Sequence, residues 1–305
     1  MGGTQLLQYL LAGITTGGVY AVVAIGFSII YNATGIINFA QGEFLMLGGM
    51  IAISLARVMP VAPAVAVAVL ATGLAGVALQ LVFLSWLKSP TVLRMIIITI
   101  GLSILLREAG LHIWDEKVHA LPFFTGDETS SLAILGARIS PQVLWVLGLS
   151  ALMVVALGLF FRSTLLGRAM RACASNATAA RLCGIRASTV VTLSFFLAAA
   201  MGALAGCAIS PLTQTRYDMG SSLAVKGFTC AVLGGLGSIP AAVAAGLVVG
   251  VLEAASVSVL PLAYKDVVAL AILLAILFVR PEGLFSRRRA ARPRPARRHG
   301  AAPSA

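Results

Sequence analysis

Long apolar segments recur along the whole chain with only short polar breaks between them. Segments 6–30, 64–87 and 241–260 each provide the roughly 20 residues that a helix needs to cross a bilayer. Only 10% of the residues are charged, whereas a soluble domain carries about 25%. A globular core of this size cannot bury so much apolar surface, but a bilayer can, so the sequence predicts a membrane protein.

The apolar segments are continuous, and this favours helices over strands. A membrane β-barrel is built from short strands that alternate between apolar and polar side chains. The 31 glycines also suit close contacts between helices in lipid, where small residues let backbones approach. We therefore predict an all-α fold, a polytopic transmembrane helical bundle of eight or nine membrane segments, some of them short or broken. The expected segments are 6–30, 36–56, 64–87, 92–114, 143–161, 190–209, 223–236, 241–260 and 267–279.

Positive charge is concentrated in two places and predicts an orientation. Five arginines and no acidic residue lie in 162–187, and eight arginines follow residue 279. Because cytoplasmic loops are enriched in Lys and Arg, both segments are expected in the cytoplasm, and the acidic segment 115–141 outside. Nucleic-acid binding by the Arg-rich tail 287–305 is not expected, since charge alone gives no sequence specificity.

The number of crossings depends on one short segment. Counting back from the basic segment 162–187 places 88–94 inside and the N-terminus outside. The Arg-rich tail returns to the cytoplasm only if an odd number of crossings follows 190–209. This favours a short run, 223–236, that crosses the membrane as a tilted or broken helix rather than re-entering on the same side.

The densest group of polar residues in an apolar context lies at 34–43. On a helix, Asn38 and Gln41 would share one face, and Glu43 would point elsewhere. Polar groups at membrane depth are costly and usually face a cavity or each other, and a broken helix is a recurrent substrate site in transporters. The alternative is an ordinary cytoplasmic helix start, with Asn38 as its cap and Glu43 favoured by the helix N-terminus. Both interpretations stay open.

Two further segments have recognisable local patterns. Gly234, Gly235 and Gly237 predict a helix break or a close helix contact, because the ending of a phosphate-binding loop is absent. The basic segment 162–187 is rich in Ala, Arg and Leu, which favours a helix up to a break at Gly184. Such a helix could lie against a partner protein or on anionic lipid.

Groupings of residues that catalyse reactions or bind metals do not occur in the sequence. The three histidines are scattered, and the four cysteines form no CxxC pair. We therefore expect no catalytic residue, no metal site and no cofactor on this chain. Lys226 and Glu253 lie in or near apolar segments, where each could pair with a neighbour or line a path.

Three motifs extend over most of the chain. They are a long segment at 18–43 that includes TGIINFAQGE, GRAMRA at 167–172 followed by AARLCGI at 179–185, and AVLGGLGSIPAA at 231–242. Together they resemble the LivH-type permeases, which are membrane subunits of ABC importers for branched-chain amino acids. The resemblance implies a transmembrane permease domain over 1–286 and a cytoplasmic Arg-rich tail over 287–305.

The resemblance also implies partners. Such permeases pair with a second, LivM-type permease in a bacterial inner membrane, with two ATPase subunits that bind ATP and Mg²⁺, and with a periplasmic substrate-binding protein. The translocation path runs between the two permeases, so Asn38, Gln41 and Glu43 are candidates for its lining.

The basic segment matches the place where these permeases contact the ATPases. A carboxylate often precedes the paired alanines there, whereas this chain has Thr178, so no specific charged contact is expected at that position. The candidate residues of this coupling loop are Arg168, Arg171, Ala179, Ala180 and Gly184.

We therefore expect a permease subunit without enzymatic activity of its own that carries branched-chain or other neutral amino acids. A permease of the same family for amides or urea is one alternative, because specificity resides largely in the binding protein. A secondary transporter coupled to an ion is another, since Glu43 and Glu253 are acids within apolar segments.

Overall fold

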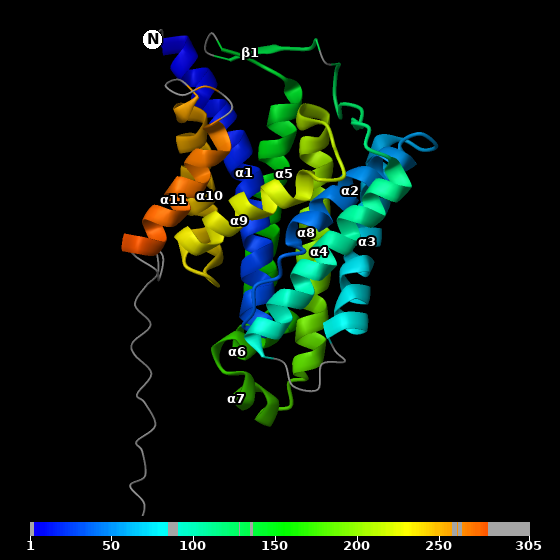
Figure 1. The fold of residues 1–305 in the computed structure, drawn as a ribbon, viewed down its shortest axis with the longest axis vertical. Coiled ribbons are helices and arrows are strands. Elements are labelled where there is room, and N and C mark those ends of the chain that lie inside the picture. Colours follow the sequence, from blue (N-terminus) through cyan, green and yellow to red (C-terminus); the bar gives the residue numbers. More distant parts are fainter. Residues whose placement is uncertain are drawn as a thin grey trace, which may run out of the picture.

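Helices form most of the structure, and one small β-hairpin covers one end (Figure 1). The computed structural model describes residues 3–84, 91–127, 129–134, 137–257, 261 and 264–279. Its elements are α1 (Gly3–Thr34), α2 (Gln41–Leu55), α3 (Val61–Leu79), the π-helix η1 (Gln80–Leu84), α4 (Val92–Trp114), β1 (Leu132–Ile134), β2 (Ala137–Ile139), α5 (Pro141–Ser163), α6 (Leu165–Ser175), α7 (Ala177–Leu182), α8 (Ala187–Thr213), α9 (Met219–Gly234), α10 (Ile239–Ser256) and α11 (Lys265–Val279).

Each of the nine apolar segments expected from the sequence overlaps a helix, and α4 has the expected bounds. Among the residues that the structure describes, five stretches are long and apolar enough to cross a membrane, which confirms a helical membrane bundle. They are Leu7–Thr34, Val61–Leu84, Pro141–Ser163, Ala187–Thr213 and Ile239–Ser256. The count of eight or nine crossings stays a prediction, and the Arg-rich tail lies outside the described residues.

The first two helices differ from the expected bounds. The polar break expected at 31–35 is mostly helical: α1 continues to Thr34, and the Gly35 N–H still donates to the Tyr31 carbonyl at 2.7 Å. The chain leaves the helix at Gly35, whose φ of +75° is open to glycine at little cost. Residues 36–40 are not helical, so α2 begins later than the apolar pattern indicated.

The acidic and basic segments lie at opposite ends of the bundle, as their charges require (Figure 1). The end that carries the chain's N-terminus also carries the antiparallel β1–β2 hairpin and a short bridge between His119 and Thr215. The basic segment forms α6 and α7 at the other end. This arrangement agrees with the predicted path of α5, which joins the acidic segment to the basic one.

The central helix α1 packs along α10 through small residues spaced four apart. A Cβ atom at Gly17 would lie 2.9 Å from the Gly246 carbonyl oxygen, and one at Gly246 would lie 2.6 Å from the Ala21 nitrogen. Gly250 makes a similarly close approach to α1. Small residues at this spacing let helix backbones touch, which is the main source of helix association in lipid.

Two short helices, α2 and α9, begin inside the bundle with their N-termini together. A Cβ at Gly220 would lie 2.8 Å from the Gly42 carbonyl oxygen, and a Cβ at Gly42 would overlap the Gly220 carbonyl.

The same order of elements occurs twice in the chain, namely a long helix, a connector, a short helix and a further helix. In α1–α2–α3 and α8–α9–α10 the last helix packs on the long helix of the other set.

The contact between α2 and α9 predicts that adding one methyl group lowers stability at Gly42 but not at a glycine outside the contact. Gly42→Ala should lower the midpoint of thermal unfolding in detergent, because overpacking at fixed backbones costs about 1–3 kcal/mol. Gly101→Ala in α4 is the matched control, since a Cβ there meets nothing within 4 Å, and alanine gains about 1 kcal/mol of helix propensity. Equal midpoints for the two variants would contradict the close contact.

Candidate functional site

Asn38 organises the connector that leads into α2. Its side-chain Oδ1 accepts a hydrogen bond from the Ala40 N–H at 3.1 Å, and its carbonyl oxygen accepts one from Gln41 at 3.2 Å. Asn38 is buried although it lies outside a helix. The prediction that Asn38 and Gln41 share a helix face is therefore wrong, because the Asn side chain bonds its own backbone in a turn and delays the helix to Gln41.

Gln41 joins three helices at the start of α2. Its Nε2 donates to the Ala198 carbonyl of α8 at 3.0 Å. A Cβ at Gly26 of α1 would overlap this amide group, so the glycine leaves the space that Gln41 fills. Gln41 is fully buried, and within the described residues its Oε1 has no hydrogen-bond partner. The start of α2 thus lies beside the middle of α1, well inside the bundle.

Glu43 lies in the first turn of α2, where α2 meets α9. Its Oε1 accepts hydrogen bonds from the Ser103 hydroxyl of α4 at 2.8 Å and from the Ser221 hydroxyl of α9 at 3.3 Å. Its Oε2 has no hydrogen-bond partner in the part of the chain described here, and the residue is 1% exposed. The positive ends of two helices meet at this point, which offsets part of the cost of burying an acid.

A cavity of about 190 Å³ lies next to Glu43, between α4 and α9. Both serines that bond Glu43 contribute to its wall, and the rings of Phe39 and Phe228 stand 5.8 Å apart beside them. The wall is therefore apolar with two hydroxyl groups in it. The cavity is lined by Phe39, Ile100, Ser103, Ile104, Ser221, Ala224, Val225 and Phe228.

Sequence reasoning identified Glu43 but not the residues that surround it. Asn38, Gln41 and Glu43 do not line the cavity themselves; Ser103 and Ser221 carry the contact from Glu43 to its surface. A lone serine in an apolar helix gives only a weak signal. Its importance comes from a partner that the sequence does not identify.

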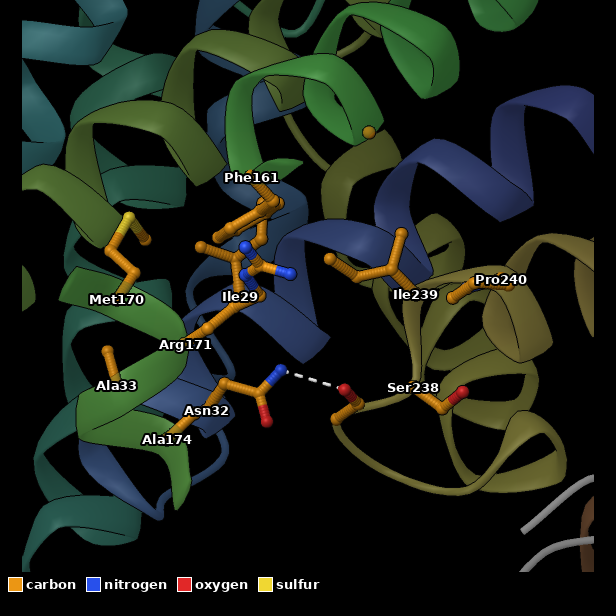
Figure 2. A pocket seen from close by; sticks show the side chains of 12 residues that line it. Ile29, Asn32, Ala33, Phe161, Met170, Arg171, Ala174, Ser238, Ile239 and Pro240 are labelled. Atoms are coloured by element: carbon orange, nitrogen blue, oxygen red, sulfur yellow. Dashed lines mark hydrogen bonds between the residues drawn. The ribbon is translucent and has the colours of Figure 1, made fainter. Parts of the chain in front are cut away.

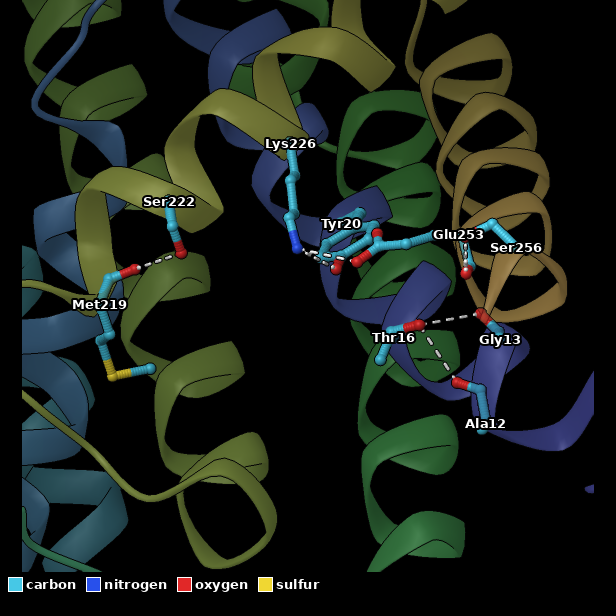
Figure 3. A network of polar contacts seen from close by, with 9 residues as sticks. All are labelled: Ala12, Gly13, Thr16, Tyr20, Met219, Ser222, Lys226, Glu253 and Ser256. Carbon is cyan, nitrogen blue, oxygen red and sulfur yellow. Dashed lines mark hydrogen bonds and ion pairs between the residues drawn. The ribbon is translucent and has the colours of Figure 1, made fainter. Parts of the chain in front are cut away.

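A buried ion pair connects α9 to α10 and α1 (Figure 3). The Lys226 Nζ lies 2.8 Å from Glu253 Oε1 and donates to the Tyr20 hydroxyl at 3.2 Å. Glu253 is fully buried, and Lys226 is 8% exposed. Of the roles left open by the sequence for these two charges, the structure supports pairing with each other.

The basic segment forms two helices instead of the single one expected. Asn176 adopts an extended backbone and caps α7 by accepting from the Thr178 and Ala179 N–H groups, both at 3.1 Å. An N-cap residue with this geometry cannot continue the preceding helix, so the chain breaks at Asn176 as well as near Gly184. Gly184 follows α7 with a φ of +83°.

The candidate residues of the coupling loop occupy different surfaces of these helices. Arg168, Arg171 and Ala179 are exposed, while Ala180 is buried and its carbonyl accepts from the Ile185 N–H at 3.0 Å. This exposed basic surface lies at the end of the bundle and is available to another molecule. The burial of Cys173 on the inner side of α6 raises the pKa of its thiol.

The glycine-rich segment forms the turn between α9 and α10. α9 ends at Gly234, and Gly235 and Gly237 have φ values of +84° and +94°. Asn32, near the end of α1, donates from Nδ2 to the Gly237 carbonyl at 2.8 Å (Figure 2). The turn is therefore held against α1 by a side chain that is more than two hundred residues away in sequence.

Comparison with known proteins matches residues 9–277 to the family described as branched-chain amino acid transport system / permease component. The chain is 35% identical to the high-affinity branched-chain amino acid transport system permease protein BraD of Pseudomonas aeruginosa, over 92% of this chain and 96% of that protein. It is 34% identical to the corresponding protein LivH of Escherichia coli, with the same coverage.

One solved structure has a similar fold. A chain in the structure of PsaBC from Streptococcus pneumoniae in complex with Fab matches with a TM-score of 0.50. The match covers 91% of this chain and 92% of that chain at 12% identity, so it concerns the fold alone.

The ion pair predicts strongly non-additive effects on stability. Lys226→Met alone should destabilise the protein by about 3–5 kcal/mol, because it leaves the buried Glu253 carboxylate without its cation. The double variant Lys226→Met/Glu253→Leu should recover most of this loss, since apolar residues of similar volume replace such pairs at little cost. Thermal unfolding of the three proteins in detergent measures both effects, and a double variant less stable than the single one would contradict the assignment.

Proposed function

This chain belongs to the family of branched-chain amino acid transport system permease components, and on that premise we propose that it is the membrane-spanning subunit of an ATP-driven ABC importer for branched-chain amino acids. The observation that carries the proposal is the match to permeases of known transport systems over 92% of the chain. The match includes the segments that form the cavity, the ion pair and the basic helices. Hydrolysis of ATP, with its Mg²⁺, is assigned to separate ATPase subunits.

The cavity beside Glu43 is proposed as part of the translocation path. A branched-chain amino acid is a zwitterion with an apolar side chain, so its path needs few polar groups in an apolar wall. Ser103, Ser221 and the carboxylate behind them provide those groups, and Phe39 and Phe228 provide the apolar surface. Weak contacts suffice, because conduction requires release. In this proposal Asn38 and Gln41 build the helix start and do not touch the substrate.

The second permease is proposed to complete the path from the side of α4. α4 presents a row of exposed apolar side chains next to the cavity, including Ile97, Ile100 and Ile104, which are 42–61% exposed. A homologous LivM-type subunit packed on this face would enclose the cavity between the two proteins. The remaining exposed apolar surface faces lipid.

The ATPases are proposed to bind at the end formed by α6 and α7. Arg168, Ala179 and Gly184 lie on its exposed surface, and its arginines place it in the cytoplasm by the positive-inside rule. The same rule places the C-terminal tail in the cytoplasm. The periplasmic binding protein then docks on the opposite end, which carries the β-hairpin (Figure 1).

An ion-coupled transporter is less well supported by the structure. Such a mechanism needs an intramembrane acid that gains and loses an ion. Of the two acids considered, Glu253 is paired with Lys226, and Glu43, which accepts hydrogen bonds from Ser103 and Ser221, is the acid that such a mechanism would have to use. The relatives that match are named as branched-chain amino acid permeases, which also favours these substrates over amides or urea.

Reconstitution tests the proposed function. The chain, expressed with its neighbouring transport genes, should extract in mild detergent as a complex with a second permease and two ATPases. In liposomes it should take up leucine only when ATP is inside and the binding protein is outside. Leucine uptake by the chain alone without ATP would reject an ABC importer in favour of a secondary transporter.

The path assignment predicts different effects of two neighbouring serines. Ser221→Val should reduce uptake by about tenfold, equivalent to ~1.4 kcal/mol, because it removes a hydroxyl from the cavity wall and a hydrogen bond from Glu43. Ser222→Val is the control, since Ser222 is exposed and bonds only the Met219 carbonyl among the contacts described. Both complexes should assemble normally, and equal uptake rates would remove Ser221 from the path.

A further inference from the structure

A second cavity, distinct from the proposed path, lies where α1, α5 and α6 meet the start of α10 (Figure 2). Its volume is about 420 Å³, within the ~300–1,000 Å³ range of small-molecule sites. It lies at the end of the bundle that carries the basic helices. Most of its wall is apolar, with Ile29, Phe161, Met170, Ile239 and Pro240 as the larger side chains.

The charge in the wall of this cavity is positive. Arg171 of α6, an exposed residue, forms part of the wall, and its side chain points toward the side of the cavity where Ile29 and Phe161 lie (Figure 2). Within the residues that the structure describes, no acid pairs with Arg171 and no hydrogen bond to its guanidinium occurs. The helix α10 begins at Ile239 in the same wall, and its N-cap Ser238 makes no side-chain capping bond. A helix N-terminus carries partial positive charge, so the two features add.

These observations define the chemistry of a ligand. The guanidinium fork of arginine matches a carboxylate in two hydrogen bonds, and the apolar wall matches a compact hydrocarbon body. The single arginine and the apolar lining do not suit a nucleotide, whose phosphates need several donors. We propose that this cavity is a binding site for a small branched-chain carboxylate, an amino acid with a branched apolar side chain or its 2-oxo acid.

Occupation of the site would affect coupling. A carboxylate held by Arg171 with its tail against Ile29 and Ile239 bridges α6 to α1 and α10. α6 must then move together with the bundle and loses freedom to follow an ATPase. This consequence rests on the proposed function, in which α6 and α7 receive the ATPases. The transported amino acid or its 2-oxo acid, once in the cytoplasm, would then slow its own import.

Glycine substitutions in α5 test the site by direct binding. Gly158 lines the cavity, and a Cβ there meets nothing within 4 Å, so Gly158→Leu should fill space without distorting the helix. Gly148→Leu is the matched control in the same helix, because Gly148 also has nothing within 4 Å and does not line the cavity. Binding of radiolabelled α-ketoisocaproate and leucine is measured on the detergent-purified assembly in nanodiscs, without ATP or binding protein.

We expect Gly158→Leu to lose affinity for the labelled compounds by at least about tenfold, and Gly148→Leu to change it by less than about twofold. Binding of either labelled compound supports the site, and the ratio of the two affinities shows whether the site prefers the amino acid or its 2-oxo acid. Leucinamide, which lacks the carboxylate, should not compete. Equal binding by the two glycine variants, binding of neither compound, or full competition by leucinamide would each overturn the proposal.

Arginine substitutions in α6 provide a second test that does not depend on filling the cavity. Arg171→Ala should weaken binding by at least about tenfold, with Arg171→Lys intermediate, because lysine keeps the charge and loses the fork. Arg168→Ala, one turn earlier and outside the cavity wall, should keep normal affinity for the labelled compounds, whatever its effect at the proposed ATPase surface. Loss of affinity that appears only in nanodiscs of anionic lipid would instead assign the cavity to a phospholipid and reject the carboxylate.

These outcomes are separable from those of the proposed function. Binding is measured without transport, so the test of the site does not depend on whether the assembly imports leucine. If uptake is ATP-driven but the labelled compounds do not bind, the importer assignment survives and the regulatory site does not.

Discussion

The close approach of two helix N-termini inside the bundle determines where the functional groups lie. Gly42 and Gly220 let the first turns of α2 and α9 touch backbone to backbone. Each turn has unsatisfied N–H groups and partial positive charge, and the surrounding lipid offers no water to compensate them. Glu43 follows Gly42 directly and accepts a hydrogen bond from Ser221, which follows Gly220. The two helix termini and the serine hydroxyl thus offset part of the cost of burying Glu43, independently of any role in transport.

The secondary structure was largely predictable from the sequence, because membrane helices depend on local composition. α4 was predicted with its observed bounds, and the charge pattern placed the acidic and basic segments at opposite ends. Predictions failed where a polar side chain competed for the backbone. Asn38 delays α2 by forming a turn with its own backbone, and Asn176 ends α6 and caps α7. Asn before a helix is a common start. This signal was weighed for Asn38 but not for Asn176, where the Ala, Arg and Leu content favoured one continuous helix.

The candidate site was only partly predictable, since its partners are far apart in sequence. Glu43 meets Ser103 and Ser221 at separations of 60 and 178 residues, and Gln41 meets the Ala198 carbonyl at a separation of 157. A single sequence carries no information on such contacts unless a motif identifies them. Polarity within an apolar segment located the site but did not distinguish a residue that lines the cavity from one that supports it.

One short helix and the turn that follows it connect three of the polar contacts described above. α9 carries Ser221 at the path cavity and Lys226 in the ion pair about one and a half turns later, and the turn that follows α9 contains Gly237, whose carbonyl Asn32 holds against α1. The first two contacts lie on the same helix, and the third follows it across the turn at Gly235 and Gly237. The turn also borders the cavity that contacts α6. α9 and the turn that follows it therefore lie between the proposed ATPase surface and the proposed path, and the Lys226–Glu253 ion pair ties the middle of α9 to α10.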